Sequence, residues 1–313
     1  MGLNTSADLA GTAPKTPSQA FMTDDSAAVL RFAVEALAAG MEAALVTLVA
    51  IDGGAARPLG AQMAVREDGL YCGYVSGGCV ESAAAFEALA VIASGQDRRV
   101  RYGKGSPWFD IVLPCGGGID LCIHKLRSVR PLLAVLNSLE QRRPAGLRYC
   151  PRTQTLHALE DAARTRWHNE GFETAYRPRV QIVLHGRSVE AQATATLARA
   201  AGFEVLPFDG PVGSAVAAID ADTAVVLLWH DLHRELPVLQ AALAGNPFYI
   251  GALGSQRTHA RRVEKLLELG WRQADIDRIK APIGIFPKAR DAQSLALSVL
   301  ADVAAARLRA EEA

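Results

Sequence analysis

The order of apolar and polar residues divides the chain into two regions with different patterns. The first region mixes strand-length apolar runs with amphipathic helices, and the second alternates the two kinds of element regularly. This pattern predicts an α/β protein in which a small α+β domain precedes a Rossmann-like, doubly wound parallel sheet. The predicted domains are residues 23–150 and 178–313, with 151–177 as a linker and 1–22 as a disordered lead.

Helices and strands of the first region follow from local signals. Asp24-Asp25-Ser26 caps a helix that carries apolar residues at helical spacing as far as Leu37. Short runs rich in aliphatic residues indicate strands, and a turn at Glu67-Asp68-Gly69 makes two of them a hairpin. Strands are predicted at 44–51, 61–65, 70–75 and 98–102, and a further amphipathic helix at 130–142.

The stretch Tyr74-Val-Ser-Gly-Gly-Cys79-Val-Glu81 joins a predicted strand to a helix that ends at Gly95. A cysteine in the first turn of a helix faces unpaired backbone N–H groups and the positive end of the helix dipole, which both favour the thiolate. Gly77 and Gly78 would let a bulky group approach the backbone. Cys79 is therefore a candidate nucleophile or soft-metal ligand. The alternative is a buried cysteine after a tight turn.

A second cysteine, in Cys115-Gly-Gly-Gly118, lies between two strand-like runs, 108–113 and 119–123. Three consecutive glycines cost backbone entropy that a plain hairpin does not require. Cys115, Gly116 and Gly117 therefore indicate a pocket lined with backbone N–H groups, with a loose hairpin as the alternative. Cys72 and Cys122 are predicted to point into packed sheet, and the lack of a close cysteine pair disfavours a zinc site.

The second region begins with the layout of a dinucleotide-binding unit. The strand Val180–Leu184 leads into Gly186-Arg-Ser188, a helix follows, and the next strand ends at Asp209. Ser188 stands where a second glycine would let a pyrophosphate approach the backbone, so the pattern favours the Rossmann fold over tight NAD binding.

Two further strand–helix units, with strands at 223–229 and 248–253, extend this parallel sheet. Ligands of such sheets bind beyond the carboxyl ends of the strands. The residues predicted there are Gly186, Asp209, His230, Asp231, Gly254, Ser255 and Arg257. Ser255 and Arg257 at a helix start suit a phosphate. A solvated basic face carrying Arg257 and Arg261, and a packing role for His230, are the alternatives.

Composition narrows the classes of function. Lys+Arg and Asp+Glu both number 33, and a net charge of zero argues against nucleic-acid binding through phosphate attraction. Residues before about Phe21 match no targeting signal, and no apolar run approaches the roughly 18 residues of a membrane span. Five cysteines without a C-x-x-C pair indicate reduced thiols in the cytoplasm.

Four motifs together resemble the xanthine dehydrogenase accessory family, XdhC/CoxI. In chain order they are Ser76-Gly-Gly-Cys79-Val-Glu81, Cys115-Gly-Gly-Gly118, Phe248-Tyr-Ile-Gly-Ala-Leu-Gly-Ser-Gln-Arg-Thr258 and Ala281-Pro-Ile-Gly284. The resemblance runs from about residue 28 to about residue 305. The chain departs from the family pattern at Ser188, Leu232, Phe286 and Lys288.

The resemblance implies an accessory chaperone for the molybdenum cofactor, a molybdopterin with or without an appended cytosine nucleotide, and not an enzyme. Such a protein binds the mature cofactor, supports its sulfuration by a cysteine desulfurase, and inserts it into an apo-molybdoenzyme of the xanthine dehydrogenase or aldehyde oxidoreductase type. The family commonly forms homodimers.

Residue by residue, the resemblance assigns the cofactor site to Gly77, Gly78, Cys79, Glu81 and the Cys115–Gly118 turn, with Gly254–Thr258 as a further signature. Cys79 is then the candidate molybdenum ligand, because thiolates suit soft metals, while N–H-lined loops suit a phosphate. A persulfide on Cys79 is the alternative chemistry. Two alternative functions also stay open: an NAD(P)-dependent oxidoreductase with Cys79 as nucleophile, and a scaffold that only joins desulfurase and client.

Overall fold

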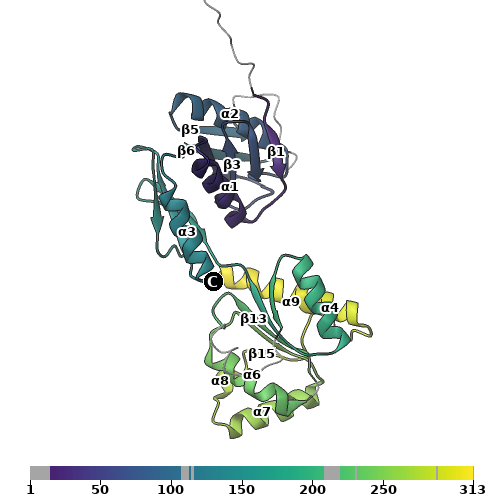
Figure 1. The fold of residues 1–313 in the computed structure, drawn as a ribbon. Coiled ribbons are helices and arrows are strands. Elements are labelled where there is room, and N and C mark those ends of the chain that lie inside the picture. Colours follow the sequence, from purple (N-terminus) through teal and green to yellow (C-terminus); the bar gives the residue numbers. More distant parts are fainter. Residues whose placement is uncertain are drawn as a thin grey trace, which may run out of the picture. The chain divides into compact units, whose positions relative to one another are not determined.

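The computed structural model describes residues 15–106, 113, 116–207, 219–229, 231–286 and 288–312. The chain divides into two compact units, Met1–Pro178 and Arg179–Ala313, which are described one at a time (Figure 1). No helix in the described ranges has the length and apolar character needed to cross a membrane.

The first unit contains a six-stranded sheet with the strand order β1-β4-β3-β2-β6-β5. Its strands are β1 (Ser18–Phe21), β2 (Ala43–Asp52), β3 (Gln62–Arg66), β4 (Leu70–Gly73), β5 (Arg98–Gly103) and β6 (Gly118–Lys125). All neighbours pair antiparallel except β1, which runs parallel to β4. The predicted hairpin is therefore present as β3 and β4.

Helices cover both faces of this sheet (Figure 1). Helix α2 (Glu81–Ser94) packs on one face and α1 (Ser26–Ala38) packs on the other, where α3 (Arg130–Glu140) lies against α1. Successive strand residues point to opposite faces, so Val46 and Leu48 of β2 contact the α2 core whereas Leu45 contacts the α1 and α3 core. With both faces covered, β2 is buried almost throughout.

Residues at the start of the described chain correct the predicted disordered lead. Ser18–Phe21 forms β1, whose Ser18 aligns with Leu70 and whose Gln19 aligns with Tyr71. The ring of Phe21 also packs edge-on against Phe32, with ring centroids 5.7 Å apart. Local composition does not reveal this strand, because its hydrogen-bond partners come from β4, about 50 residues later in the chain.

The segment predicted as a linker is part of a second sheet in the same unit. This four-stranded sheet contains β7 (Ala145–Cys150), β8 (Thr155–Leu159), β9 (Arg166–His168) and β10 (Gly171–Tyr176), in the order β8-β7-β10-β9. The hydroxyl of Tyr176 donates to Gln62 Oε1 at 2.6 Å and Trp167 Nε1 donates to Val49 O at 2.9 Å, which fixes this sheet on the larger one. Strands β8 and β9 have no buried residues, so they lack a clear hydrophobic alternation.

The second unit is the predicted Rossmann-like domain (Figure 1). Its parallel sheet has the order β12-β11-β13-β14-β15. The strands are β11 (Gln181–His185), β12 (Glu204–Pro207), β13 (Thr223–Leu227), β14 (Tyr249–Ala252) and β15 (Ile279–Lys280). Helices α4 (Val189–Ala200) and α9 (Ala292–Glu312) cover one face, and α6 (Leu232–Ala244), α7 (Gln256–Glu268) and α8 (Gln273–Ile276) cover the other.

Helix α9 holds the Ala281–Gly284 motif in place. The buried carboxylate of Asp302 accepts hydrogen bonds from Tyr249 Oη at 2.6 Å and from Gly284 N at 3.2 Å, and it pairs with Lys280. One turn away, Ser298 Oγ accepts from Ile285 N and Phe286 N, both at 2.8 Å. These contacts give the motif a structural role in closing the sheet onto α9.

Candidate functional site

Cys79 lies at the tip of an exposed loop. Gly77, Gly78 and Cys79 are all exposed, and the Cys79 thiol is free, which excludes the alternative of a buried cysteine. Helix α2 begins at Glu81 with Val80 as its N-cap, so Cys79 precedes the helix and does not lie in its first turn as predicted.

The buried carboxylate of Glu81 accepts hydrogen bonds from several backbone groups of this loop. Its Oε1 accepts from Val75 N at 3.1 Å and Ser76 N at 2.7 Å, and its Oε2 accepts from Val80 N at 3.1 Å. The hydroxyl of Ser76 donates to the same carboxylate and accepts from Cys79 N at 3.3 Å. Glu81 is only 2% exposed. Its side chain therefore stabilises the loop through buried hydrogen bonds and does not face a cofactor directly.

This arrangement corrects the predicted electrostatics. Backbone N–H groups at the start of α2 were expected to face Cys79, but the carboxylate of Glu81 already accepts from that of Val80. A negative side chain in the first turn also offsets the positive end of the helix dipole. The structure thus presents Cys79 on a loop whose shape is held by hydrogen bonds to Glu81 and Ser76.

The two glycine-rich loops lie at the same edge of the six-stranded sheet. Cys115 is outside the described residues, but Gly117 packs so closely on the β2–β3 loop that a Cβ there would come within 2.2 Å of Gly54 O. Two residues further along the same loop, Ala56 lies against Gly77, with 3.4 Å between its Cβ and a Cβ built at Gly77. Strands β4 and β6, which carry the two loops, are three strand spacings apart, or roughly 14 Å.

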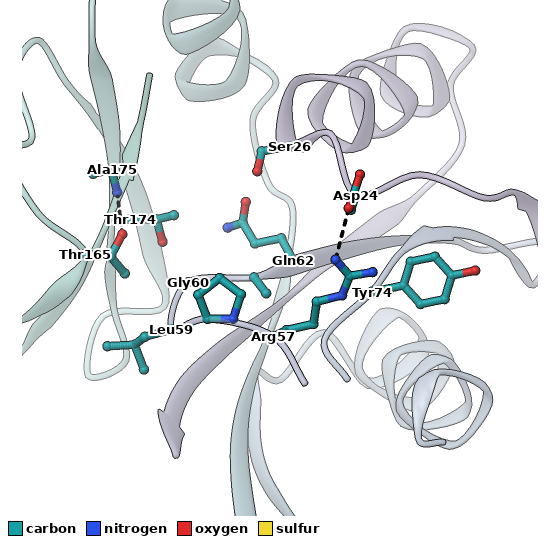
Figure 2. A pocket seen from close by; sticks show the side chains of 12 residues that line it. Asp24, Ser26, Arg57, Leu59, Gly60, Gln62, Tyr74, Thr165, Thr174 and Ala175 are labelled. Atoms are coloured by element: carbon teal, nitrogen blue, oxygen red, sulfur yellow. Dashed lines mark hydrogen bonds and ion pairs between the residues drawn. The ribbon is translucent and has the colours of Figure 1, made fainter. Parts of the chain in front are cut away.

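Beside the Cys79 loop, a cavity of about 350 Å³ opens between the two sheets of the first unit (Figure 2). Arg57 lines it and also donates from Nε to Ser76 O at 3.4 Å, so the cavity wall contacts the cysteine loop directly. A single arginine in a loop carries no sequence signal, and sequence reasoning missed it. Only the contact with Ser76 identifies Arg57.

Three other cysteines, among the described residues of the first unit, are placed differently. Cys72 and Cys122 are buried in the sheet as predicted, and burial raises the pKa of their thiols to about 12 and about 11. Cys150 is half-buried on β7. Within the described ranges, no group of three or more His, Cys, Asp or Glu side chains could hold a metal ion.

At the carboxyl edge of the Rossmann-like sheet, Gly186 follows β11 and Gly254 follows β14, on either side of β13. A Cβ at Gly186 would lie 3.0 Å from Leu228 O, so the glycine there permits close packing. Ser188, at the position of the expected second glycine, is the N-cap of α4 and accepts from Ala191 N at 3.4 Å. Asp209 and His230, also predicted at this edge, are outside the described residues.

The remaining residues predicted at this edge lie at the starts of α7 and α6. Ser255 is the N-cap and accepts from Thr258 N at 3.2 Å, while the side chains of Arg257 and Arg261 are exposed. Arg262, in contrast, is fully buried and pairs with the buried Glu235, with Arg262 Nη2 2.7 Å from Glu235 Oε2. Asp231 serves as the N-cap of α6.

Sequence reasoning also missed an aromatic and basic cluster at this edge. The rings of His185 and Trp229 lie 5.7 Å apart, and the guanidinium of Arg234 lies 4.8 Å from the centre of the Trp229 ring. A tryptophan at a strand end is the only sequence signal for this cluster, because the histidine and the arginine come from other elements.

Comparison with known proteins agrees with this two-unit architecture. The XdhC and CoxI family matches residues 36–103, and the XdhC Rossmann domain matches residues 182–303. The molybdenum cofactor insertion chaperone PaoD of Escherichia coli (strain K12) is 66% identical over 296 residues, which cover 95% of this chain and 93% of that protein. The chain belongs to the XdhC and CoxI family. This confirms the family resemblance drawn from the motifs.

Two other proteins are more distant from this member of the XdhC and CoxI family. The uncharacterized protein YqeB of Escherichia coli (strain K12) is 26% identical over 246 residues, which cover 78% of this chain but 40% of that protein. The crystal structure of a xanthine dehydrogenase from Bacillus halodurans superposes with a TM-score of 0.68 at 20% identity, over 90% of this chain and 96% of that chain. At that identity the match shows a shared fold.

Proposed function

We propose that this protein is an accessory chaperone that binds the mature molybdenum cofactor in the cytoplasm. It supports sulfuration of the cofactor by a cysteine desulfurase and inserts the product into an apo-molybdoenzyme of the xanthine dehydrogenase or aldehyde oxidoreductase type. The observation that carries the proposal is the exposed Cys79 thiol on a loop that Glu81 holds in shape. The relative PaoD, named as a molybdenum cofactor insertion chaperone, supports it.

The residues around Cys79 fit this cargo. A thiolate is a suitable ligand for a soft metal centre, and the loop is open, since a Cβ built at Gly78 meets no atom within 4 Å. The guanidinium of Arg57, which donates to Ser76 O, supplies a positive charge for an anionic cofactor. Because Cys79 lies on an exposed loop, a cargo that it holds stays accessible for transfer, as a chaperone requires.

Substitution of Cys79 tests the proposal. Full-length wild type, Cys79→Ser and Cys150→Ser are purified from cells that make the cofactor, and bound molybdenum and released pterin are measured per chain. We expect Cys79→Ser to lower retention by about tenfold or more, a scale reached even by indirect partners of metal sites. The control Cys150→Ser, altered at a half-buried thiol of the same unit, should match the wild type. Equal retention by all three proteins contradicts the role of Cys79.

The same preparations address the two alternative functions. A scaffold that only joins desulfurase and client would contain no pterin in any preparation. An NAD(P)-dependent oxidoreductase would bind NADH at micromolar concentration in a fluorescence titration. We expect no such binding, because Ser188 occupies the second glycine position and its hydroxyl caps α4. Size-exclusion chromatography with light scattering tests the proposed homodimer.

A further inference from the structure

The cavity beside the Cys79 loop has the features of a binding site for a small polar molecule. Its volume of about 350 Å³ falls in the range of small-molecule sites. The β2–β3 loop forms one wall and the β9–β10 side of the smaller sheet forms the opposite wall (Figure 2). The walls are closely joined at Gly60, where a Cβ would lie 2.6 Å from Thr165 Cγ2.

Arg57 is held in this cavity in a pose suited to an anion. Its guanidinium lies 5.3 Å from the centre of the Tyr74 ring, and its Nε donates to Ser76 O. Its remaining partner is Asp24, at 3.1 Å from Nη1, and the Asp24 side chain is 75% exposed. Such a solvent-exposed ion pair contributes little, so a phosphate can replace Asp24 on the guanidinium. Arg57 Nη2 has no hydrogen-bond partner among the described residues.

Neutral polar groups complete the wall opposite Arg57. Thr165 Oγ1 accepts from Ala175 N at 3.0 Å, which leaves its hydroxyl hydrogen available to a ligand (Figure 2). The hydroxyl of Thr174 lines the same wall and has no hydrogen bond within the described ranges. One arginine with neutral hydroxyls suits a phosphate monoester joined to a polar ring, and not a highly charged polyphosphate.

Ser76 connects the cavity to the cysteine. Its carbonyl accepts from Arg57 Nε and its hydroxyl accepts from Cys79 N. The cavity wall and the cysteine loop are therefore joined through this one residue. The molybdenum cofactor carries a group for each place, because one side chain of its pterin holds both the dithiolene-bound metal and the phosphate ester.

We propose that this cavity binds the phosphorylated pterin of the cargo, with Arg57 pairing to the phosphate while Cys79 holds the metal. The inference rests on the proposed chaperone function and adds a second recognition point to it. It assigns Arg57 a binding role that does not depend on the metal, so a metal-free ligand can test it.

The probe is 6-hydroxymethylpterin monophosphate, compared with unphosphorylated 6-hydroxymethylpterin, and binding to the full chain is followed by pterin fluorescence. We expect the wild type to bind the phosphorylated probe more tightly, and Arg57→Gln to weaken that binding by about tenfold or more, the scale of a charged hydrogen bond. Binding of the unphosphorylated probe should not change. Asp24→Asn, which removes the competing carboxylate, should strengthen binding of the phosphorylated probe.

Two control variants separate this inference from the chaperone proposal. Arg31→Gln, on α1 and 3.7 Å from Asp25, removes an exposed arginine outside the cavity and should leave probe binding unchanged. Cys79→Ser should also bind the metal-free probe normally, although it fails to retain molybdenum. Melting temperatures check that each variant is folded, and Arg57→Lys, which keeps the charge, should lose less affinity than Arg57→Gln.

Equal affinity of wild type for the two probes overturns the phosphate assignment, as does unchanged binding by Arg57→Gln. If the wild type retains the cofactor and Arg57→Gln retains it equally well, only this inference fails. If the wild type retains no pterin at all, the chaperone proposal itself fails.

Discussion

Replacing Glu81 by Gln should loosen the Cys79 loop without unfolding the first unit. Glutamine has nearly the same shape as glutamate, so packing around the side chain is kept. Its oxygen can still accept from Val75 N and Ser76 N, as Oε1 of Glu81 does. Its –NH₂ group, placed where Oε2 now lies, would face Val80 N, one donor against another.

The size of the effect follows from these bonds. A buried donor left without an acceptor costs about 1–3 kcal/mol, and the bonds that remain lose the strengthening that a charged acceptor gives. The sum is about 2–4 kcal/mol of local stability. Because 1.4 kcal/mol is a factor of ten, the loop should open roughly 30- to 700-fold more often.

Hydrogen exchange followed by mass spectrometry measures this opening directly, on peptides that contain residues 74–82. Glu87→Gln, on the same helix and paired with Arg98, provides the control, since it alters a partly exposed ion pair and should have little effect. Cofactor retention should fall with loop order. If the amides of Val75, Ser76 and Val80 exchange at wild-type rates in Glu81→Gln, the structural role assigned to this carboxylate is wrong.

Three further predictions concern other charged groups. Burial raises the pKa of Asp97, but hydrogen bonds from His124, Lys125 N and Tyr149 outweigh it and lower the pKa below its usual 3.8. The first unit should therefore lose the stability that Asp97 contributes as pH falls below about 4, and urea unfolding of Asp97→Asn should show a smaller loss over that range than the wild type. Glu235→Gln should destabilise the second unit by roughly 3–5 kcal/mol, because it leaves the buried Arg262 without its counter-charge, and an unchanged urea midpoint would contradict this. Arg257→Ala should weaken binding of cytidine monophosphate about tenfold in calorimetry, with the melting temperature unchanged because the side chain is exposed; equal affinity would remove Arg257 from any nucleotide site.

Local pattern determined most elements of this protein. The hydrophobic spacing of α1, α2 and α3 and the aliphatic runs of β2, β11 and β13 identify these elements, because each buries a face whose period is set by its own backbone geometry. Gly95 ends α2 in a left-handed conformation, as its position in the sequence predicts. The strand–helix alternation after residue 178 likewise predicts a parallel sheet with helices on both faces.

Elements that depend on distant partners were missed. Strand β1 has no strong period, and it is held by pairing with β4, about 50 residues later in the chain. The arginines near Arg262 in the sequence suggest an exposed basic helix face. In the structure, however, Arg262 is buried and pairs with Glu235 of another helix. A sequence pattern contains no information about which buried charge will find a partner.

The candidate site shows the same division. The sequence alone selected Cys79 and its two glycines, since a cysteine between a glycine pair and a helix is a chemically unusual combination. Only the tertiary structure decided that Glu81 faces inward to shape the loop, and that Arg57 reaches Ser76 across 19 residues of chain. The physical reason is that the chemistry of a side chain is given by its own residue. Which groups contact it depends on how distant strands and loops pack together.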